Sequence, residues 1–152
     1  MGDRDETQRE RLNRKWNDLI QELRVMQTGA QLTAGFLLTL PFQSSFEDLD
    51  VFQVRLYLTL VLLAAITTAL VMSAVAVHRR LSGEDVKERL VVAAHRITIA
   101  VLTTISLLIT GMVLLVFDVV LERPAAFLWS GAVAAVVVVL LVVLPHRLSR
   151  DR

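Results

Sequence analysis

The chain has 152 residues, of which 55% are hydrophobic, and its formal net charge is only +1. A soluble domain of this length has too much surface to bury so many apolar side chains, and the near-neutral charge does not favour nucleic acid as a partner. The absence of cysteine excludes disulfides, thiol catalysis and cysteine-ligated metals. Because the apolar residues are gathered into long runs, the sequence predicts an integral membrane protein.

Residues 7–23 are predicted to form an amphipathic helix on the cytoplasmic side. Leu12, Trp16 and Leu19 recur at helical spacing, and charged residues occupy the opposite face. The segment is not a signal peptide, since it lacks an apolar stretch of about seven residues. It either lies along the membrane surface, forms a collar that packs against copies of itself, or continues into the first span as one rod of about 50 Å.

Four segments meet or approach the roughly 20 apolar residues that a helix needs to cross a bilayer. Their apolar centres carry no Asp, Glu, Lys or Arg. Without water to satisfy the backbone, such spans must be helical, so the predicted fold class is all-α: an integral membrane four-helix bundle with an N-terminal amphipathic helix. The spans are expected at residues 24–42, 54–78, 92–118 and 124–145.

Basic residues predict the orientation of these spans. Of the 16 basic residues, only Arg55 and Arg123 fall on the side opposite the two termini. The positive-inside rule therefore predicts a multi-pass protein of the inner (plasma) membrane with both termini in the cytoplasm. The loops on the outer side are short, so the spans form two antiparallel hairpins. In the middle loop, Ser82 is expected to cap a helix that runs straight into the third span.

The first span carries a stripe of polar and small residues on one face. A glutamine that faces lipid costs several kcal/mol unless it finds a partner, so the stripe is expected to face protein or water. Two interpretations remain open: the stripe is a seam for helix packing, or it lines a hydrated path for an ion or small solute. Its members are Arg24, Gln27, Thr28, Gln31, Gly35 and Thr39.

Charged and polar residues are expected to gather at the two ends of the spans. At the inner mouth we expect Glu22, His95 and Arg96, with Arg96 either extending to the lipid headgroups or pairing with Glu22. The acidic residues of the outer mouth are expected to attract cations. They are Glu47, Asp48, Asp50 and Asp118.

The other spans are plainer. Thr103, Thr110 and Gly111 of the third span share one side, which is expected to pack against the first or second span. Tyr57 and Trp129 are expected to belong to an aromatic belt at the outer interface. Prolines near the span ends are expected to stop or start helices.

No nucleotide-binding loop, catalytic triad, pair of catalytic carboxylates or HExxH motif occurs. The sequence therefore does not predict an enzyme, a cofactor or a metal site. The spans also lack an acidic residue near the membrane midplane, which argues against a proton-coupled antiporter of the usual carboxylate kind.

The segment Gln21–Phe42, QELRVMQTGAQLTAGFLLTLPF, resembles a family of small actinobacterial membrane proteins catalogued as domain-of-unknown-function family 6328. The similarity extends through YLTLVLLAA of the second span, the HRR after it and FDVVL at the end of the third span. The resemblance implies a four-span membrane protein and brings no established activity or site residues. Some members of the family are labelled as cation antiporters, and the missing intramembrane carboxylate argues against that mechanism here.

The functional hypothesis is a small homo-oligomeric channel or transporter for ions, with cations favoured and the first span lining the path. A polar seam is buried better in an oligomer than in a single copy. The alternative is a non-transporting membrane scaffold or accessory subunit whose stripe is only a packing seam. The expected partners are the lipid bilayer, further copies of the chain and an ion.

Overall fold

A computed structural model describes residues 8–80 and 87–150, which form helices joined by short turns, with no strand among them. The prediction of an all-α fold is therefore confirmed for the described part of the chain. The expected cap at Ser82 lies outside the described residues. In chain order the elements are α1 (Gln8–Thr39), the short 3₁₀ helices η1 (Leu40–Phe42) and η2 (Ser44–Phe46), α2 (Val51–Arg80), α3 (Lys87–Val120), α4 (Arg123–Val138), the π-helical segment η3 (Val139–Val143) and α5 (Leu144–Arg150).

Three helical segments are long and apolar enough to cross a membrane: Val51–Ser73, His95–Val120 and Arg123–Arg147. They coincide with the second, third and fourth predicted spans, and the chain is a membrane protein. Helix α1 is not among the three segments because its polar stripe lowers its hydrophobicity. At about 1.5 Å per residue, its 32 residues are long enough for a bilayer, so the first span stays a prediction.

The amphipathic segment and the predicted first span form one continuous helix, α1. Of the arrangements that the sequence leaves open, the structure has the rod that continues into the first span. The side chains of Leu12 and Trp16 lie outside the described side chains. The rod ends where Pro41 enters η1, because proline has no N–H to continue the helical hydrogen bonds.

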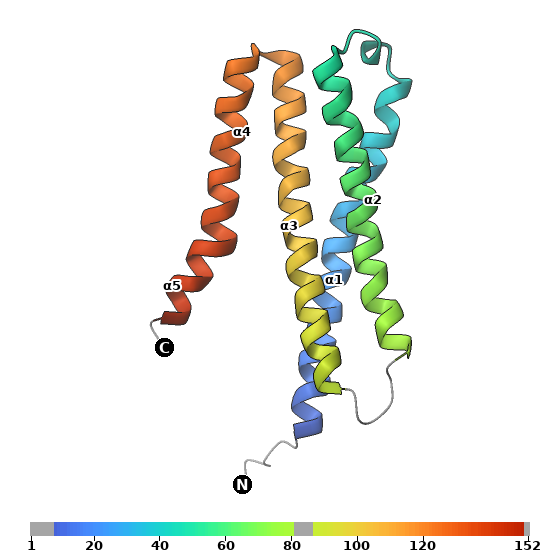
Figure 1. Cartoon of the computed structure of the whole chain (residues 1–152), viewed down its shortest axis with the longest axis vertical. Coiled ribbons are helices and arrows are strands. Elements are labelled where there is room, and N and C mark those ends of the chain that lie inside the picture. Colours follow the sequence, from blue (N-terminus) through green and yellow to red (C-terminus); the bar gives the residue numbers. More distant parts are fainter. Residues whose placement is uncertain (1–7, 81–86, 151–152) are drawn as a thin grey trace.

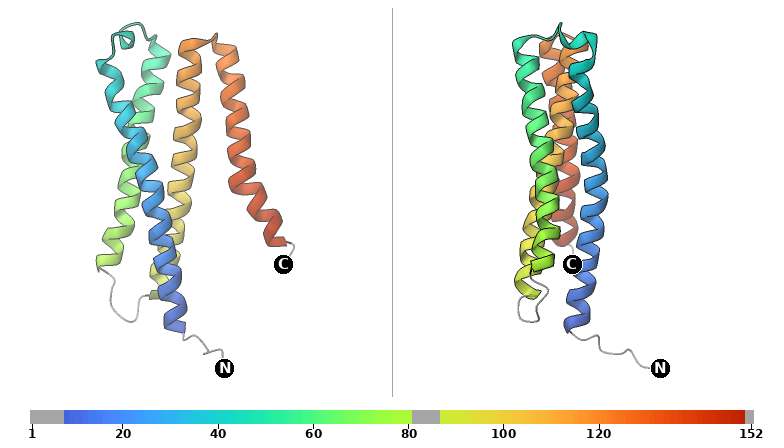
Figure 2. Two further views of the ribbon diagram at one scale, coloured as in Figure 1. Left: turned by 180° about the vertical axis from the view of Figure 1, so that it is seen from behind. Right: turned by 90° about the vertical axis from the view of Figure 1, so that its right-hand side faces the viewer.

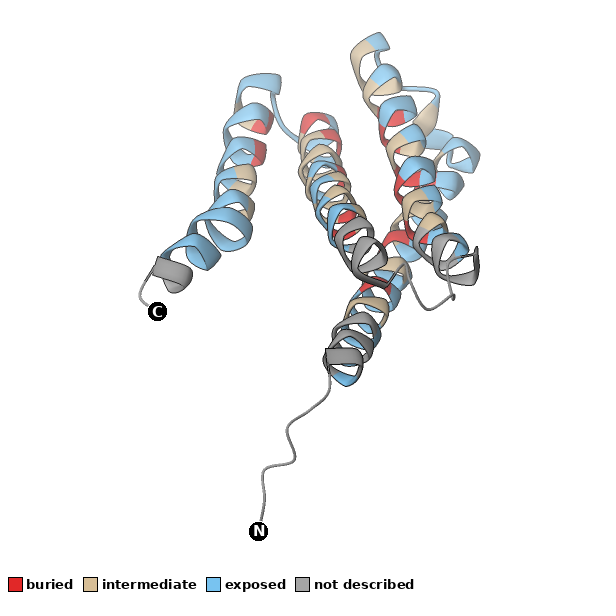
Figure 3. Cartoon of the chain, turned by 60° about the horizontal axis from the view of Figure 1, so that its bottom comes forward, coloured by how far each residue is buried: buried red, intermediate tan, exposed pale blue. Residues whose placement is uncertain are grey.

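The helices form a three-helix core with one outlying rod. Helices α1, α2 and α3 all pack against one another, whereas the backbone of α4 approaches only α3 among the described long helices. Figures 1 and 2 show the rod of α4 and α5 diverging from α3 toward the C-terminus. In Figure 3 the buried residues of the core face neighbouring helices, while α4 and α5 are largely exposed. The four helices of the expected bundle are therefore not packed equally: three form the core and α4 is attached to α3 alone among the described long helices.

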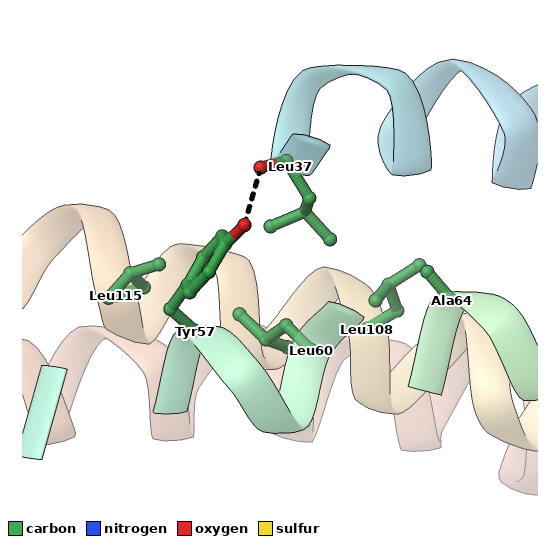
Figure 4. Close-up of a cluster of buried hydrophobic side chains, with 6 residues drawn as sticks. All are labelled: Leu37, Tyr57, Leu60, Ala64, Leu108 and Leu115. Atoms are coloured by element: carbon green, nitrogen blue, oxygen red, sulfur yellow. Dashed lines mark hydrogen bonds between the residues drawn. The ribbon is translucent and has the colours of Figure 1, made fainter. Parts of the chain in front are cut away.

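We use outer for the end of the molecule where α2 begins and inner for the opposite end, after the predicted orientation. The outer half of the core is organised around a buried tyrosine. Tyr57 is 5% exposed and packs edge-on against Phe46, with 5.1 Å between the ring centroids. Its hydroxyl donates a hydrogen bond of 3.1 Å to the carbonyl oxygen of Leu37 (Figure 4). That carbonyl needs a donor, because Pro41, four residues later, has no N–H. The prediction that Tyr57 lies in an interfacial aromatic belt is therefore wrong; Trp129 is half exposed.

The expected seam of α3 divides between two neighbours. Gly111 does face α2: a Cβ atom added there would lie 2.5 Å from Cδ2 of Leu60. Thr103 and Thr110, by contrast, line a groove shared with α4. The prediction that both threonines pack on α1 or α2 is wrong, because α1 and α2 already cover the opposite side of α3, which carries Val101 and Leu108.

Candidate functional site

The rotation of α1 is set by three apolar residues spaced seven apart. Leu23, Ala30 and Leu37 are at most 3% exposed, and Leu23 and Leu37 lie in the two apolar clusters that α1 shares with α2 and α3. Residues seven apart recur on nearly the same side of a helix. Because this side is turned into the core, the polar side of α1 is turned away from it.

The polar stripe therefore lies on the outer surface of the chain. Five of its six members are exposed and Gln27 is half-buried; the exposed ones are Arg24, Thr28, Gln31, Gly35 and Thr39. A Cβ atom added at Gly35 would meet nothing within 4 Å. The stripe is not a seam between helices of one copy, and it needs lipid, water or another protein surface to cover it.

The polar groups of the stripe differ in their hydrogen bonding. The hydroxyls of Thr28 and Thr39 donate to carbonyls of their own helix, at 3.2 Å to Arg24 and 2.7 Å to Phe36. Within the described part of the chain, the amide of Gln31 makes no hydrogen bond. The same holds for the amide of Gln27, so the two glutamines are the amides of the stripe that need an outside partner, and Gln31 is the more exposed of the two.

The residues expected at the inner mouth are not brought together into a site. Glu22, His95 and Arg96 are all exposed. No ion pair joins Glu22 to Arg96 among the residues that the structure describes, so the pairing alternative is not realised. Arg96 lies at the start of the apolar segment His95–Val120 of α3, and in the predicted orientation its side chain would extend toward lipid headgroups.

At the outer end, two of the expected acidic residues form a polar cluster with Gln53 and Arg123. The side chain of Asp118 is 1% exposed, and its Oδ1 accepts a hydrogen bond of 2.9 Å from Nε of Arg123. Its Oδ2 accepts from Nη2 of Arg123 at 3.1 Å and from Nε2 of Gln53 at 3.0 Å. Arg123 also forms an ion pair with Asp50. The cluster thus links the start of α2 with the turn between α3 and α4.

The start of α2 holds its part of the cluster through reciprocal capping. The backbone N–H of Gln53 donates to Oδ1 of Asp50 at 2.9 Å, and the N–H of Asp50 donates to Oε1 of Gln53 at 3.0 Å. This is the geometry of a capping box, which satisfies two backbone donors at a helix start. The hydrogen bond from the Gln53 backbone, followed by that from Arg123, lowers the pKa of Asp50 below its ordinary value of 3.8.

Aromatic rings complete the outer end. The guanidinium carbon of Arg123 lies 4.4 Å from the ring centroid of Phe52, a cation–π contact. The ring of Phe52 in turn lies 6.0 Å from that of Phe127 on α4. These contacts and the polar cluster hold the outer end of α4 against α2, although the backbones of the two helices lie apart.

The outer mouth therefore differs from the predicted set of four acidic residues. Asp50 and Asp118 both form ion pairs with Arg123, whose single positive charge balances only one of the two carboxylates, while Glu47 and Asp48 are exposed in the loop. The sequence interpretation missed Gln53 and Arg123 as partners of these carboxylates. The spacing Asp50-x-x-Gln53 ahead of an apolar run is a capping-box signal that predicts the Gln53 contact. Nothing in the sequence places Arg123 beside Asp50.

No group of three or more His, Asp or Glu side chains in the described part of the chain is arranged to hold a metal ion.

Residues 5–145 match the family of unknown function DUF6328. No match was found among curated proteins or among solved structures. Because the matched region covers nearly the whole chain, the resemblance seen in Gln21–Phe42 is confirmed, and the chain belongs to the DUF6328 family.

Proposed function

We propose that the chain is a small homo-oligomeric membrane channel or transporter for ions, in which the polar stripes of several α1 helices line a shared path. The observation that supports this proposal is the position of the stripe on the outside of the chain. A single copy in a bilayer would turn Gln31 toward acyl chains, at a cost of several kcal/mol. Assembly around an axis beside α1 removes this cost by giving the stripe water or a partner stripe.

The rest of the surface suits such an assembly. Helix α4 makes no backbone approach to α1 among the described helices, so α4 is free to face lipid while α1 faces the axis. Apart from Arg123 at its start, its exposed side chains are apolar, with Leu128 71% and Val136 57% exposed. Apolar side chains of this kind are stable in contact with lipid tails. In the proposed arrangement α1 supplies the first of four spans, and both termini are cytoplasmic.

The chemistry of the stripe favours weak binding of ions. Hydroxyl and amide oxygens coordinate cations without a fixed charge, which lets an ion enter a path and also leave it. Glu47 and Asp48, exposed beyond the outer end of α1, would raise the local cation concentration. The proposed cargo is therefore a small cation.

A scaffold or accessory role is the second candidate, and one observation favours it. Gly35 and Thr39 are two small residues one turn apart on an exposed surface, and small residues at this spacing let two helices approach closely. In that case the stripes of two copies would pack directly, with no water between them.

Ion flux into liposomes separates the two functions. The full chain is reconstituted and potassium flux is measured for the wild type, for Gln31→Leu, and for Phe36→Leu as the control, since Phe36 is exposed on α1 about 90° away from the stripe. We expect flux in the wild type, a reduction of about tenfold or more in Gln31→Leu with the oligomer intact, and no change in Phe36→Leu.

Three other results would contradict the transport proposal. An oligomer without flux would assign the stripe to a scaffold. Loss of the oligomer in Gln31→Leu would identify the stripe as a packing seam. A wild-type chain that stays monomeric in the bilayer would eliminate both functions, because both require the stripe to meet another copy.

A further inference from the structure

A groove of about 360 Å³ lies between α3 and the rod formed by α4 and η3. On the α3 side it is lined by residues such as Thr103 and Leu107, and on the other side by residues such as Ala134, Val138 and Leu141. Three hydroxyl residues also line it: Thr103 and Ser106 donate within their own helix, at 2.9 Å to Ile99 and 2.7 Å to Leu102, and Thr110 lies at the outer end of the groove. The other lining residues are apolar, so the groove offers a mainly apolar surface to whatever fills it.

The groove exists because the two helices separate toward their inner ends. Near the outer end they pack closely, with Ala126 and Ser130 of α4 buried. Beyond Val138 the rod passes through the π-helical segment η3 and then Pro145, two features that bend helices. Figure 1 shows the resulting divergence between α3 and the rod of α4 and α5.

The length of the groove matches one leaflet of a bilayer. Along α3 it extends from Ile99 to Thr110, which is about 16 Å at 1.5 Å per residue. Half of a hydrocarbon core about 30 Å thick is about 15 Å. A transmembrane helix from a second copy would need a groove along the full thickness, and the close packing around Ala126 excludes it from the outer half.

Two arginines lie beyond the inner end of the groove, one on each of its two helical sides. Arg96 lies one turn before Ile99 on α3, and Arg147 follows η3 on α5; both side chains are exposed. The chain has no acidic residue from Arg96 to Phe117 or from Pro124 to Arg150. An apolar groove one leaflet long, with arginines at its open end, complements a molecule with an acyl tail and an anionic head.

We propose that this groove is a binding site for an anionic phospholipid of the inner leaflet. An acyl chain lies between α3 and η3, and the phosphate group is held by Arg96 and Arg147. Guanidinium groups suit this role because they donate paired hydrogen bonds to phosphate oxygens. No residue of α1 lines the groove, so the lipid-binding proposal does not depend on whether the chain transports ions.

Native mass spectrometry of the full chain, purified in detergent, tests the proposal. The probes are phosphatidylglycerol and phosphatidylcholine with identical acyl chains, added in equal amounts. We expect the wild type to retain phosphatidylglycerol preferentially. Arg96→Gln and Arg147→Gln should each lower that preference about fivefold, as expected for one arginine near an anionic headgroup. Arg55→Gln, at the outer end, should not.

A second pair of variants tests the groove itself. Ala134→Phe places a ring in the groove and should remove most of the retained lipid, whereas Ala135→Phe places the same ring on the exposed side of α4 and should not. Equal retention of the two lipids by the wild type would overturn the proposal. The proposal would also be overturned if the two phenylalanine variants retained equal amounts of lipid. The same holds if Ala134→Phe changed the oligomeric state without losing lipid.

Discussion

Pro41 leaves the carbonyl oxygen of Leu37 without the amide donor that a continuing helix would supply, and Tyr57 fills that place from another helix. A proline near the end of a helix is a local signal, visible in the sequence. The identity of the replacement donor is not local, because it depends on how α2 rotates against α1. At the scale of single residues, this hydrogen bond shows a tertiary contact supplying the donor that a proline removes from its own helix.

Tyr57→Phe removes this donor and leaves the Leu37 carbonyl buried without a partner. We expect the free energy of unfolding in detergent to fall by about 1–3 kcal/mol, the cost of an unsatisfied buried polar group. Thr59→Val is the control, since Thr59 is exposed and its hydroxyl bonds only to its own helix, at the carbonyl of Arg55. Equal destabilisation by both substitutions would mean that the tyrosine hydroxyl has no special role.

Asp50 makes the stability of the outer end depend on pH. Its pKa in the folded protein is lowered from 3.8, chiefly by the backbone N–H of Gln53 and then by Arg123. The stability that its ionised form contributes is therefore present above about pH 4 and is lost as the pH falls through the lower, folded-state pKa.

Asp50→Asn tests this dependence, because asparagine keeps the ability to cap α2 but not the charge. We expect the variant to be less stable than the wild type near neutral pH and the difference to vanish in strong acid. Unfolding in detergent across the acid range measures it. Asp48→Asn, an exposed neighbour, should follow the wild-type profile, and a difference between wild type and Asp50→Asn that is constant with pH would contradict the assignment.

At the scale of elements, the contact between α2 and α3 depends on the absence of a side chain at Gly111. An added methyl group would lie 2.5 Å from Cδ2 of Leu60, which is 2% exposed in the outer core cluster. Leu60 must therefore move within a packed cluster, or the helices must separate.

Gly111→Ala should lower the free energy of unfolding by about 1–3 kcal/mol, as overpacking of a core does. Gly131→Ala on α4 is the matched control: a Cβ atom there meets nothing within 4 Å, and alanine is the better helix former, so stability should stay equal or rise by up to about 1 kcal/mol. Thermal unfolding in detergent compares the two variants, and a stabilising Gly111→Ala would show that Leu60 yields without cost.

The hydropathy of each segment explains which helices could be predicted from the sequence. The spans expected at residues 54–78, 92–118 and 124–145 lie within α2, α3 and the rod of α4 to α5, because runs of apolar residues report directly on burial in lipid. The sequence does not decide whether residues 7–23 and the first span form one rod, since surface helices and the ends of spanning helices share an amphipathic pattern.

At the scale of the whole molecule, the arrangement of the helices is asymmetric. Three helices share a core, α4 is attached to one edge, and the polar stripe of α1 faces outward. An outward stripe is the feature that connects the fold to the proposed function, because assembly is the way for Gln31 to avoid lipid. The separation of α4 from α3 produces the second surface of interest, the groove that we assign to a phospholipid.

The sequence by itself determined the all-α class, the membrane environment and the opposition of an apolar and a polar face on α1, since hydropathy and helical periodicity are properties of consecutive residues. It also pointed to the DUF6328 family, to which the chain belongs. Only the tertiary structure decided that Arg123 pairs with both Asp50 and Asp118, that Tyr57 is buried, and that the threonines of α3 face α4. These contacts join residues far apart in the chain, and they depend on the rotation and separation of whole helices, which local patterns do not encode.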